Sequence, residues 1–197
     1  MLTFAIPCLF GLEGLVGDEV RRLGLKEVRV DNGRVFCQGT LADVPRLNIN
    51  IRCGERVLIV LRTFPARSFE ALFQGASAVA WEELVPADGQ FPVKGYSLDS
   101  QLHSVPDCQK IIKRAAADRL GRAYGLGRMP ETGAKYQIQF ALMRDQCTLY
   151  LDTTGPGLHK RGYRAVGVEA PLRETLAAAM VTLSRYRGRD PFRDPFC

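Results

Sequence analysis

Asp31-Asn32-Gly33 is the feature that most constrains the fold, because it stands between two short runs rich in valine. Asn-Gly in that setting is the strongest short signal for a β-hairpin. Residues 1–63 therefore read as a ferredoxin-like βαββαβ domain, a fold that many functions share. The other elements of this domain are expected at Leu2–Ile6 (strand), Gly11–Leu23 (helix), Leu41–Ile51 (helix) and Arg56–Arg62 (closing strand).

A second α+β domain is expected over residues 64–164, after a crossing at Thr63–Arg67. Trp81 ends its first predicted helix and is expected in the core, with base stacking as the alternative. Periodicity and turn residues place the remaining elements and a closing linker. They are a helix at Phe69–Trp81, a strand at Phe91–Lys94, a helix at Val105–Gly121, a hairpin at Lys135–Leu151 and the linker Thr153–Gly157.

Positive charge is concentrated in two parts of the chain, whose net charge is +6. Residues 91–130 hold seven basic against three acidic side chains, and residues 156–197 hold eight against four. A surface that binds a polyanion needs such clustering, although an Arg-rich composition alone would also produce it. The six cysteines form no C-x-x-C pair, so buried free thiols in a reducing cytoplasm are expected, with no metal site and no membrane span.

The predicted helix Val105–Gly121 can present cations on a rigid support. Cys108 and Ile112 lie on one side of it, whereas Lys110, Lys113 and Arg114 fall on the other at about 100° per residue. Ser104 is placed to cap the helix, and the polar residues before it could bond to sugar or phosphate. The alternative is an ordinary solvated face of an amphipathic helix.

The run Phe91–Leu120 (F-P-V-K-G-Y-S-L-D-S-Q-L-H-S-V-P-D-C-Q-K-I-I-K-R-A-A-A-D-R-L) resembles the middle of a THUMP domain. The resemblance implies an RNA-binding surface that reads RNA shape rather than base sequence. Carried over by position, the RNA-binding residues are Lys94, Ser104, Gln109, Lys110, Lys113 and Arg114.

Three later motifs resemble the THUMP-containing RNA methyltransferases, and among them the bacterial type that methylates guanine N2 in large-subunit ribosomal RNA. They are L-H-K-R-G-Y-R (Leu158–Arg164), A-P-L-R-E-T-L-A-A-A-M (Ala170–Met180) and D-P-F-C (Asp194–Cys197). The resemblance implies S-adenosylmethionine as cofactor and makes residues 165–197 the start of a class I, Rossmann-like methyltransferase domain. The further RNA-binding candidates are then Lys160, Arg161, Tyr163 and Arg164. The alternative for Tyr163 is a structural role, in which its ring packs at the boundary between the domains. The candidate cofactor-binding residues are Pro171, Leu172, Asp194, Pro195 and Cys197.

No catalytic residue is expected within the chain itself. In the family, D-P-F-C continues into a G-S-G-T loop, and an Asn/Asp-Pro-Pro-Tyr/Phe tetrapeptide holds the amine to be methylated. This chain ends at Cys197 and contains no such tetrapeptide. We therefore expect it to bind RNA without binding S-adenosylmethionine or transferring a methyl group alone. The helix after Pro171 is expected to expose an apolar stripe because its partner sheet is missing.

Several functions remain open. The leading interpretation is the RNA-recognition part of a ribosomal RNA guanine-N2 methyltransferase. A transfer RNA guanine-N2 methyltransferase of the same build and a stand-alone THUMP module are the alternatives. A DNA adenine methylase, a THUMP sulfur-transfer enzyme and a scaffold without a nucleic-acid role are less favoured.

Overall fold

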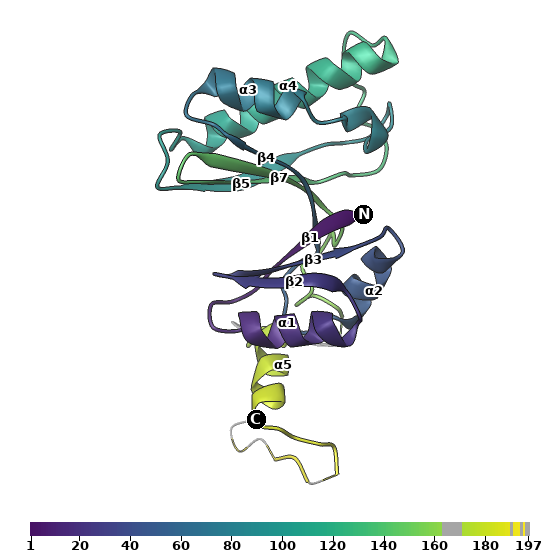
Figure 1. Ribbon diagram of the computed structural model, residues 1–197. Coiled ribbons are helices and arrows are strands. Elements are labelled where there is room, and N and C mark those ends of the chain that lie inside the picture. The colour runs from purple at the N-terminus through teal and green to yellow at the C-terminus, as the bar shows by residue number, and fades with distance from the viewer. Residues whose placement is uncertain (163–170, 190, 194, 196–197) are drawn as a thin grey trace. The chain divides into compact units, whose positions relative to one another are not determined.

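The computed structural model describes residues 1–162, 171–189, 191–193 and 195, and divides the chain into two α+β units (Figure 1). The first unit combines Met1–Val57 with Pro156–Cys197, and the second is Leu58–Gly155. The first division thus falls a few residues before the crossing expected at Thr63–Arg67, and the chain after the linker returns to the first unit.

The first unit is built on the hairpin that Asn32-Gly33 predicts. Strands β2 (Lys26–Asp31) and β3 (Arg34–Gly39) pair antiparallel, and β1 (Leu2–Pro7) pairs antiparallel with β3. Gly33 has φ +70°, which the turn requires. Helices α1 (Glu13–Arg22) and α2 (Asp43–Asn50) bury Val20 and Leu47.

The strand expected at Arg56–Arg62 forms as β4, and its contacts group it with the second unit. Strand β4 runs Leu58–Pro65 and pairs antiparallel with β7 (Gln146–Asp152) over its length. The two strands lie far apart in the sequence, so no local pattern could indicate this pairing.

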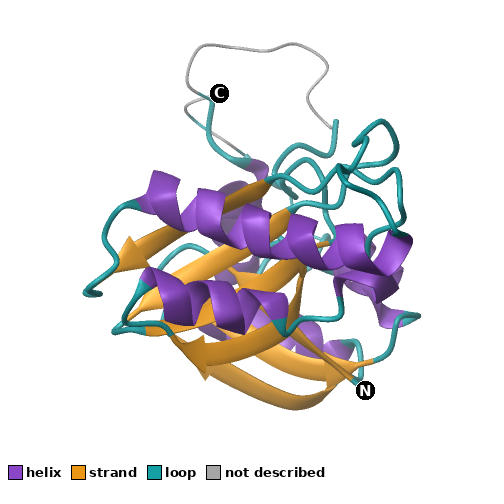
Figure 2. Ribbon diagram, turned by 90° about the horizontal axis from the view of Figure 1, so that it is seen from above, coloured by secondary structure: helices purple, strands orange, loops and turns teal. Residues whose placement is uncertain are grey.

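In the second unit, the helices lie on one side of the sheet strands (Figures 1 and 2). The order of these strands is β4-β7-β6-β5, where β6 is Ile138–Met143 and β5 is Val93–Leu98; β5 is parallel to β6, and the other pairs are antiparallel. Helices α3 (Phe69–Ser77) and α4 (Val105–Tyr124) and the short 3-10 turn η1 (Trp81–Glu83) complete the unit.

Trp81 lies in the core of the second unit. It is fully buried, and its indole N–H donates to the carbonyl of Ala76 at 2.8 Å. The core prediction for Trp81 is therefore confirmed, and base stacking by this side chain is ruled out.

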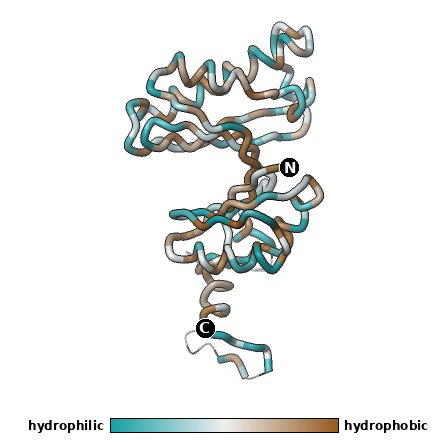
Figure 3. Tube along the Cα trace, in the orientation of Figure 1, coloured by the Kyte–Doolittle hydropathy of each residue, from teal (hydrophilic) through white to brown (hydrophobic). Residues whose placement is uncertain are grey.

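Helix α5 (Glu174–Leu183) belongs to the first unit and exposes an apolar stripe, as expected. Thr175 and Ala179 are buried, whereas Leu172, Met180 and Leu183 are 47%, 56% and 62% exposed. Beyond α5 the described chain is mainly hydrophilic (Figure 3).

Candidate nucleic-acid interface

Helix α4 is a rigid support for the predicted RNA-binding residues. Its buried side consists of Cys108, Ile112, Ala115, Ala116 and Leu120, and Pro106 stands in its first turn. The periodicity of these apolar residues anchors one side of the helix in the core and leaves the opposite side to solvent.

Lys110 and Arg114 lie on the outer side of α4, one turn apart. Each has an acidic neighbour on the same helix: Lys110 Nζ is 3.4 Å from Asp107 Oδ1, and Arg114 Nε is 3.8 Å from Asp118 Oδ2. The two basic side chains remain 78% and 73% exposed. Exposed pairs of this kind contribute about 0–1 kcal/mol and yield readily to a phosphate.

Lys113 is held more firmly than the other two cations. Its ammonium donates to Glu131 Oε2 at 2.8 Å and lies 4.9 Å from the centre of the Phe91 ring. The side chain is 41% exposed. Lys113 therefore joins α4 to the loop that carries Glu131, and it reaches solvent beside that loop.

Ser104 and Asp107 organise the start of α4 differently from the expected cap. Ser104 occupies the N-cap position, but its hydroxyl donates to Asp107 Oδ2 at 2.6 Å instead of accepting from the backbone. The Ser104 hydroxyl, and after it Lys110, lower the pKa of the Asp107 carboxyl. Gln109 is half-buried on the next turn.

Lys94 does not lie with the cations of α4. Along β5, Val93 packs against the core under the helices, so the alternation of a strand sends Lys94 to the other face of the sheet. The polar loop after β5 is internally braced: Ser97 donates to the Leu102 carbonyl at 2.7 Å and Ser100 to the Leu98 carbonyl at 2.8 Å. The structure thus brings Lys110, Lys113 and Arg114 together and separates Lys94 from them.

Arg161 has a structural role in the first unit. Its guanidinium donates to the carbonyls of Ile49 at 2.7 Å, Asn48 at 3.0 Å and Ile51, and its Nε donates to Leu158 at 3.1 Å. These bonds satisfy carbonyls at the C-terminal end of α2, which a helix leaves without intrahelical partners. Lys160 is exposed beside it. Tyr163 and Arg164, also predicted to bind RNA, lie outside the described residues.

Glu55 fastens the start of α5 to the first unit. Its carboxylate accepts from the Thr175 hydroxyl at 2.9 Å and lies 3.6 Å from Arg173 Nη1. His159 Nδ1 is 3.3 Å from Glu55 Oε2, but the angle does not make a hydrogen bond.

The described residues alone do not fit S-adenosylmethionine. Pro171 and Leu172 line a cavity of about 350 Å³ whose charged groups are Lys160, Arg173 and Glu174. Two cations beside one carboxylate oppose a ligand that carries a positive sulfonium. Pro195 is exposed, and Asp194 and Cys197 lie outside the described residues.

The described part of the chain holds no cluster of three His, Cys, Asp or Glu side chains that could bind a metal ion. None of its helices is both long and apolar enough to cross a membrane. Cys37, Cys53, Cys108 and Cys147 are buried free thiols, as the sequence indicates, and Cys8 is half-buried.

Models of three protein domains match the chain one after another. The RlmL ferredoxin-like domain matches residues 3–58, the THUMP domain residues 66–152, and the RMKL-like methyltransferase domain residues 161–197. The chain belongs to the THUMP-containing methyltransferase family. The predicted family and the α+β fold class are therefore confirmed.

Family members are longer than this chain. "Putative RNA methyltransferase YpsC" of Bacillus subtilis (strain 168) is 43% identical over 197 residues, which make up 99% of this chain and 51% of that protein. "Ribosomal RNA large subunit methyltransferase K/L" of Psychromonas ingrahamii is 31% identical over 198 residues, 100% of this chain and 26% of that protein. The chain thus spans about half of the first relative and a quarter of the second.

Two solved structures in the family are close to this one. A Listeria monocytogenes protein described as a "predicted N6-adenine-specific DNA methylase" has 44% identity and a TM-score of 0.94, over 100% of this chain and 52% of its own. SMU.472 complexed with SAH has 40% identity and a TM-score of 0.93 over the same shares. SAH is the demethylated form of S-adenosylmethionine, which is therefore the cofactor of the family.

Proposed function

We propose that this chain is the RNA-recognition part of an S-adenosylmethionine-dependent methyltransferase that modifies the N2 amine of a guanine in large-subunit ribosomal RNA. The THUMP match and the ribosomal RNA methyltransferase relatives support the RNA substrate. A transfer RNA guanine-N2 methyltransferase of the same build and a stand-alone THUMP module are the alternatives.

The observation that carries RNA binding is the basic ridge, which we define as Lys110, Lys113 and Arg114 on α4. Lys110 and Arg114 are exposed on a helix whose other side is fixed in the core, so binding requires no ordering of their backbone. Their ion pairs with Asp107 and Asp118 are weak because both partners of each pair are exposed to solvent. Displacing these carboxylates costs little free energy compared with the free energy gained when a phosphate backbone releases its counterions.

The ridge is tested by RNA binding across salt concentrations. Lys110→Ala and Arg114→Ala together are expected to lower the slope of log affinity against log salt by about two, because two phosphate contacts are lost. Arg22→Ala, on the exposed side of α1, removes one positive charge away from the ridge and is expected to leave the slope unchanged. Equal slopes for all three proteins would refute the ridge as the binding surface.

The substrate is tested by competition. Fragments of large-subunit ribosomal RNA are expected to displace a bound RNA hairpin at lower concentrations than transfer RNA does. The reverse order would favour the transfer RNA alternative. Methyl transfer is tested with tritiated S-adenosylmethionine and identification of the modified nucleotide; transfer to adenine in place of guanine would refute the proposed reaction.

A further inference from the structure

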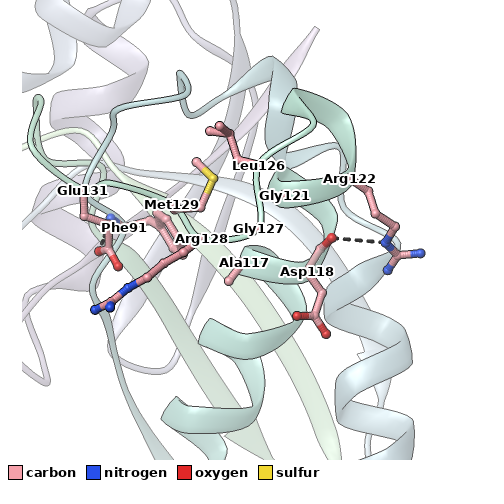
Figure 4. A pocket seen from close by; sticks show the side chains of 10 residues that line it. All are labelled: Phe91, Ala117, Asp118, Gly121, Arg122, Leu126, Gly127, Arg128, Met129 and Glu131. Atoms are coloured by element: carbon pink, nitrogen blue, oxygen red, sulfur yellow. Dashed lines mark hydrogen bonds between the residues drawn. The ribbon is translucent and has the colours of Figure 1, made fainter.

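A pocket lies where α4 ends, in the second unit (Figure 4). Its volume is about 560 Å³, within the usual range for small-ligand sites. The end of α4 supplies Arg122, and the loop that returns along the helix supplies Arg128 and Glu131. Figure 4 shows Arg128 and Glu131 on one side of the pocket and Arg122 on the other.

The walls of this pocket are fixed by the way α4 ends. Gly125 takes a left-handed conformation with φ +66°, and the N–H of Leu126 donates to the Gly121 carbonyl at 2.9 Å. A Cβ at Gly121 would lie 2.8 Å from the Leu126 carbonyl oxygen, so the close return depends on glycine there. The Tyr124 hydroxyl donates to the Val85 carbonyl at 2.9 Å and fastens the last turn.

The lining suits a planar ring with hydrogen-bond donors on its edge. Ala117 and Leu126 supply apolar surface, and the buried side chains of Phe91 and Met129 lie behind it. Glu131 is held in place because its Oε2 accepts from Lys113 at 2.8 Å and from the Phe91 N–H at 3.5 Å. Its Oε1 receives no hydrogen bond from the part of the chain that the structure describes, and a carboxylate only accepts.

Two arginine side chains, Arg122 and Arg128, lie at the edge of the pocket. Arg122 donates through Nε to the Asp118 carbonyl at 3.1 Å, which leaves its terminal nitrogens directed outward. Arg128 forms no hydrogen bond or ion pair with any residue in the described ranges. A ligand with both a ring and a phosphate would place the ring against the apolar lining and the phosphate beside Arg122 and Arg128.

The basic ridge leads into this pocket. Lys110, Arg114, Ala117 and Gly121 follow one another on one side of α4, at intervals of three or four residues. At 1.5 Å per residue, Lys110 and Gly121 are about 16 Å apart along the helix, the reach of about three extended nucleotides. Arg114 also shares Asp118 with the pocket wall, since its Nε lies 3.8 Å from that carboxylate.

We propose that this pocket binds the base of one unpaired guanine in RNA whose backbone lies along the basic ridge. Guanine carries two adjacent N–H donors, at N1 and N2, which match the Glu131 carboxylate. Arg128 and Arg122 contact the flanking phosphates. This inference rests on the proposed RNA binding and adds a base-selective subsite to it.

The test compares RNA hairpins that differ only in an unpaired extension. The probes are a blunt hairpin and the same hairpin with a three-nucleotide extension, at either end, that terminates in guanine, inosine or uridine. For the 197-residue chain, the guanine extension at one of the ends is expected to bind about tenfold more tightly than uridine, with inosine between them because it lacks the N2 amine. Glu131→Gln and Arg128→Ala are each expected to abolish the preference, measured within each variant as the ratio of its affinities for the guanine and uridine extensions, so that a change in overall RNA affinity through Lys113 or through lost charge cancels.

The possible outcomes separate the two proposals. Equal affinity for guanine and uridine extensions overturns the subsite, as does a preference that survives both substitutions. Loss of the preference in Arg22→Ala, a charge control on α1, would also overturn it. Failure of every RNA to bind overturns the subsite together with the proposed function, whereas blunt-hairpin binding without a guanine preference overturns the subsite alone.

Discussion

Arg161 and the ridge cations show how differently basic side chains are used in this chain. The Arg161 guanidinium contacts four main-chain carbonyls, which its planar fork of donors can reach together. Lys110 is exposed and has one weak partner. The sequence places both residues in basic runs and does not distinguish them, because carbonyl acceptors more than 100 positions away in the chain leave no local pattern.

Replacing Arg161 with lysine separates the structural role of this residue from the effect of its positive charge. Arg161→Lys keeps the positive charge but loses most of the carbonyl contacts, and is expected to destabilise the protein by about 1–2 kcal/mol. RNA affinity is expected to stay the same. Urea unfolding and RNA titration measure the two effects, with Lys160→Met as the control that removes a neighbouring exposed charge. A stable Arg161→Lys variant with weakened RNA binding would assign Arg161 to the interface after all.

Glu82 and Arg119 make stability depend on pH. Arg119 donates to both carboxylate oxygens, at 2.8 and 2.6 Å, and lowers the pKa of Glu82 from 4.5 to about 2. A carboxyl whose pKa is lower in the folded state stabilises the protein above the unfolded pKa, and this contribution is lost as the pH falls from about 5 towards 2. About a third of each side chain meets solvent, so the contribution is about 1 kcal/mol.

The measurement compares urea midpoints of the natural chain and of Glu82→Gln from pH 7 to pH 3. The natural chain is expected to be more stable at pH 7, and the difference is expected to shrink on acidification. A difference that is constant with pH would mean that the ion pair does not set the titration of Glu82.

At the scale of elements, periodicity predicts where helices lie better than where they end. The apolar spacing of Val105–Gly121 locates α4, but the helix continues to Tyr124 because Gly121 keeps helical geometry. Gly125 ends it, with its left-handed φ. The sequence does not tell whether Gly121 or Gly125 takes the left-handed conformation that ends the helix, since that depends on the path of the loop that follows.

Glycine substitutions at the end of α4 test this account. Gly125→Ala is expected to destabilise the protein by about 1 kcal/mol, because alanine is strained at positive φ. Gly121→Ala is expected to cost at least as much and to distort the pocket, since its Cβ would meet the Leu126 carbonyl at 2.8 Å. Gly127→Ala is the matched control, with nothing within 4 Å of the added Cβ. Thermal unfolding measures all three, and equal losses at positions 125 and 127 would contradict the assigned cap.

At the scale of the whole chain, local signals predict the secondary structure, whereas contacts between distant segments decide which unit each segment joins. The hairpins at Asn32-Gly33 and Arg144-Asp145 follow from their turns, and both form. The pairing of β4 with β7 and the bond from Thr175 to Glu55 join segments at least 80 residues apart along the chain. The return of the chain to the first unit after Gly155 therefore required the structure, as did the position of Lys94 on the face away from α4.

The buried thiols report on the two units separately. Burial raises the pKa of Cys37 and of Cys53 in the first unit to about 12, and that of Cys147 in the second unit to about 12. At pH 8 only roughly one in 10⁴ of such thiols is the reactive thiolate, so each should react with iodoacetamide only when its surroundings unfold. Cys8 is half-buried, with its pKa raised to about 11, and is expected to react sooner.

Pulse labelling at increasing urea, read by mass spectrometry of peptides, checks this expectation. Cys37 and Cys53 should become labelled over one transition because they lie in one unit. Cys108 and Cys147 should also share a transition, since both pack in the core of the second unit. Labelling of Cys147 in the absence of urea as fast as Cys8 would show that this core opens without unfolding. Different midpoints for Cys108 and Cys147 would show that the second unit does not unfold as one body, because a single core cannot release its two thiols at different denaturant concentrations.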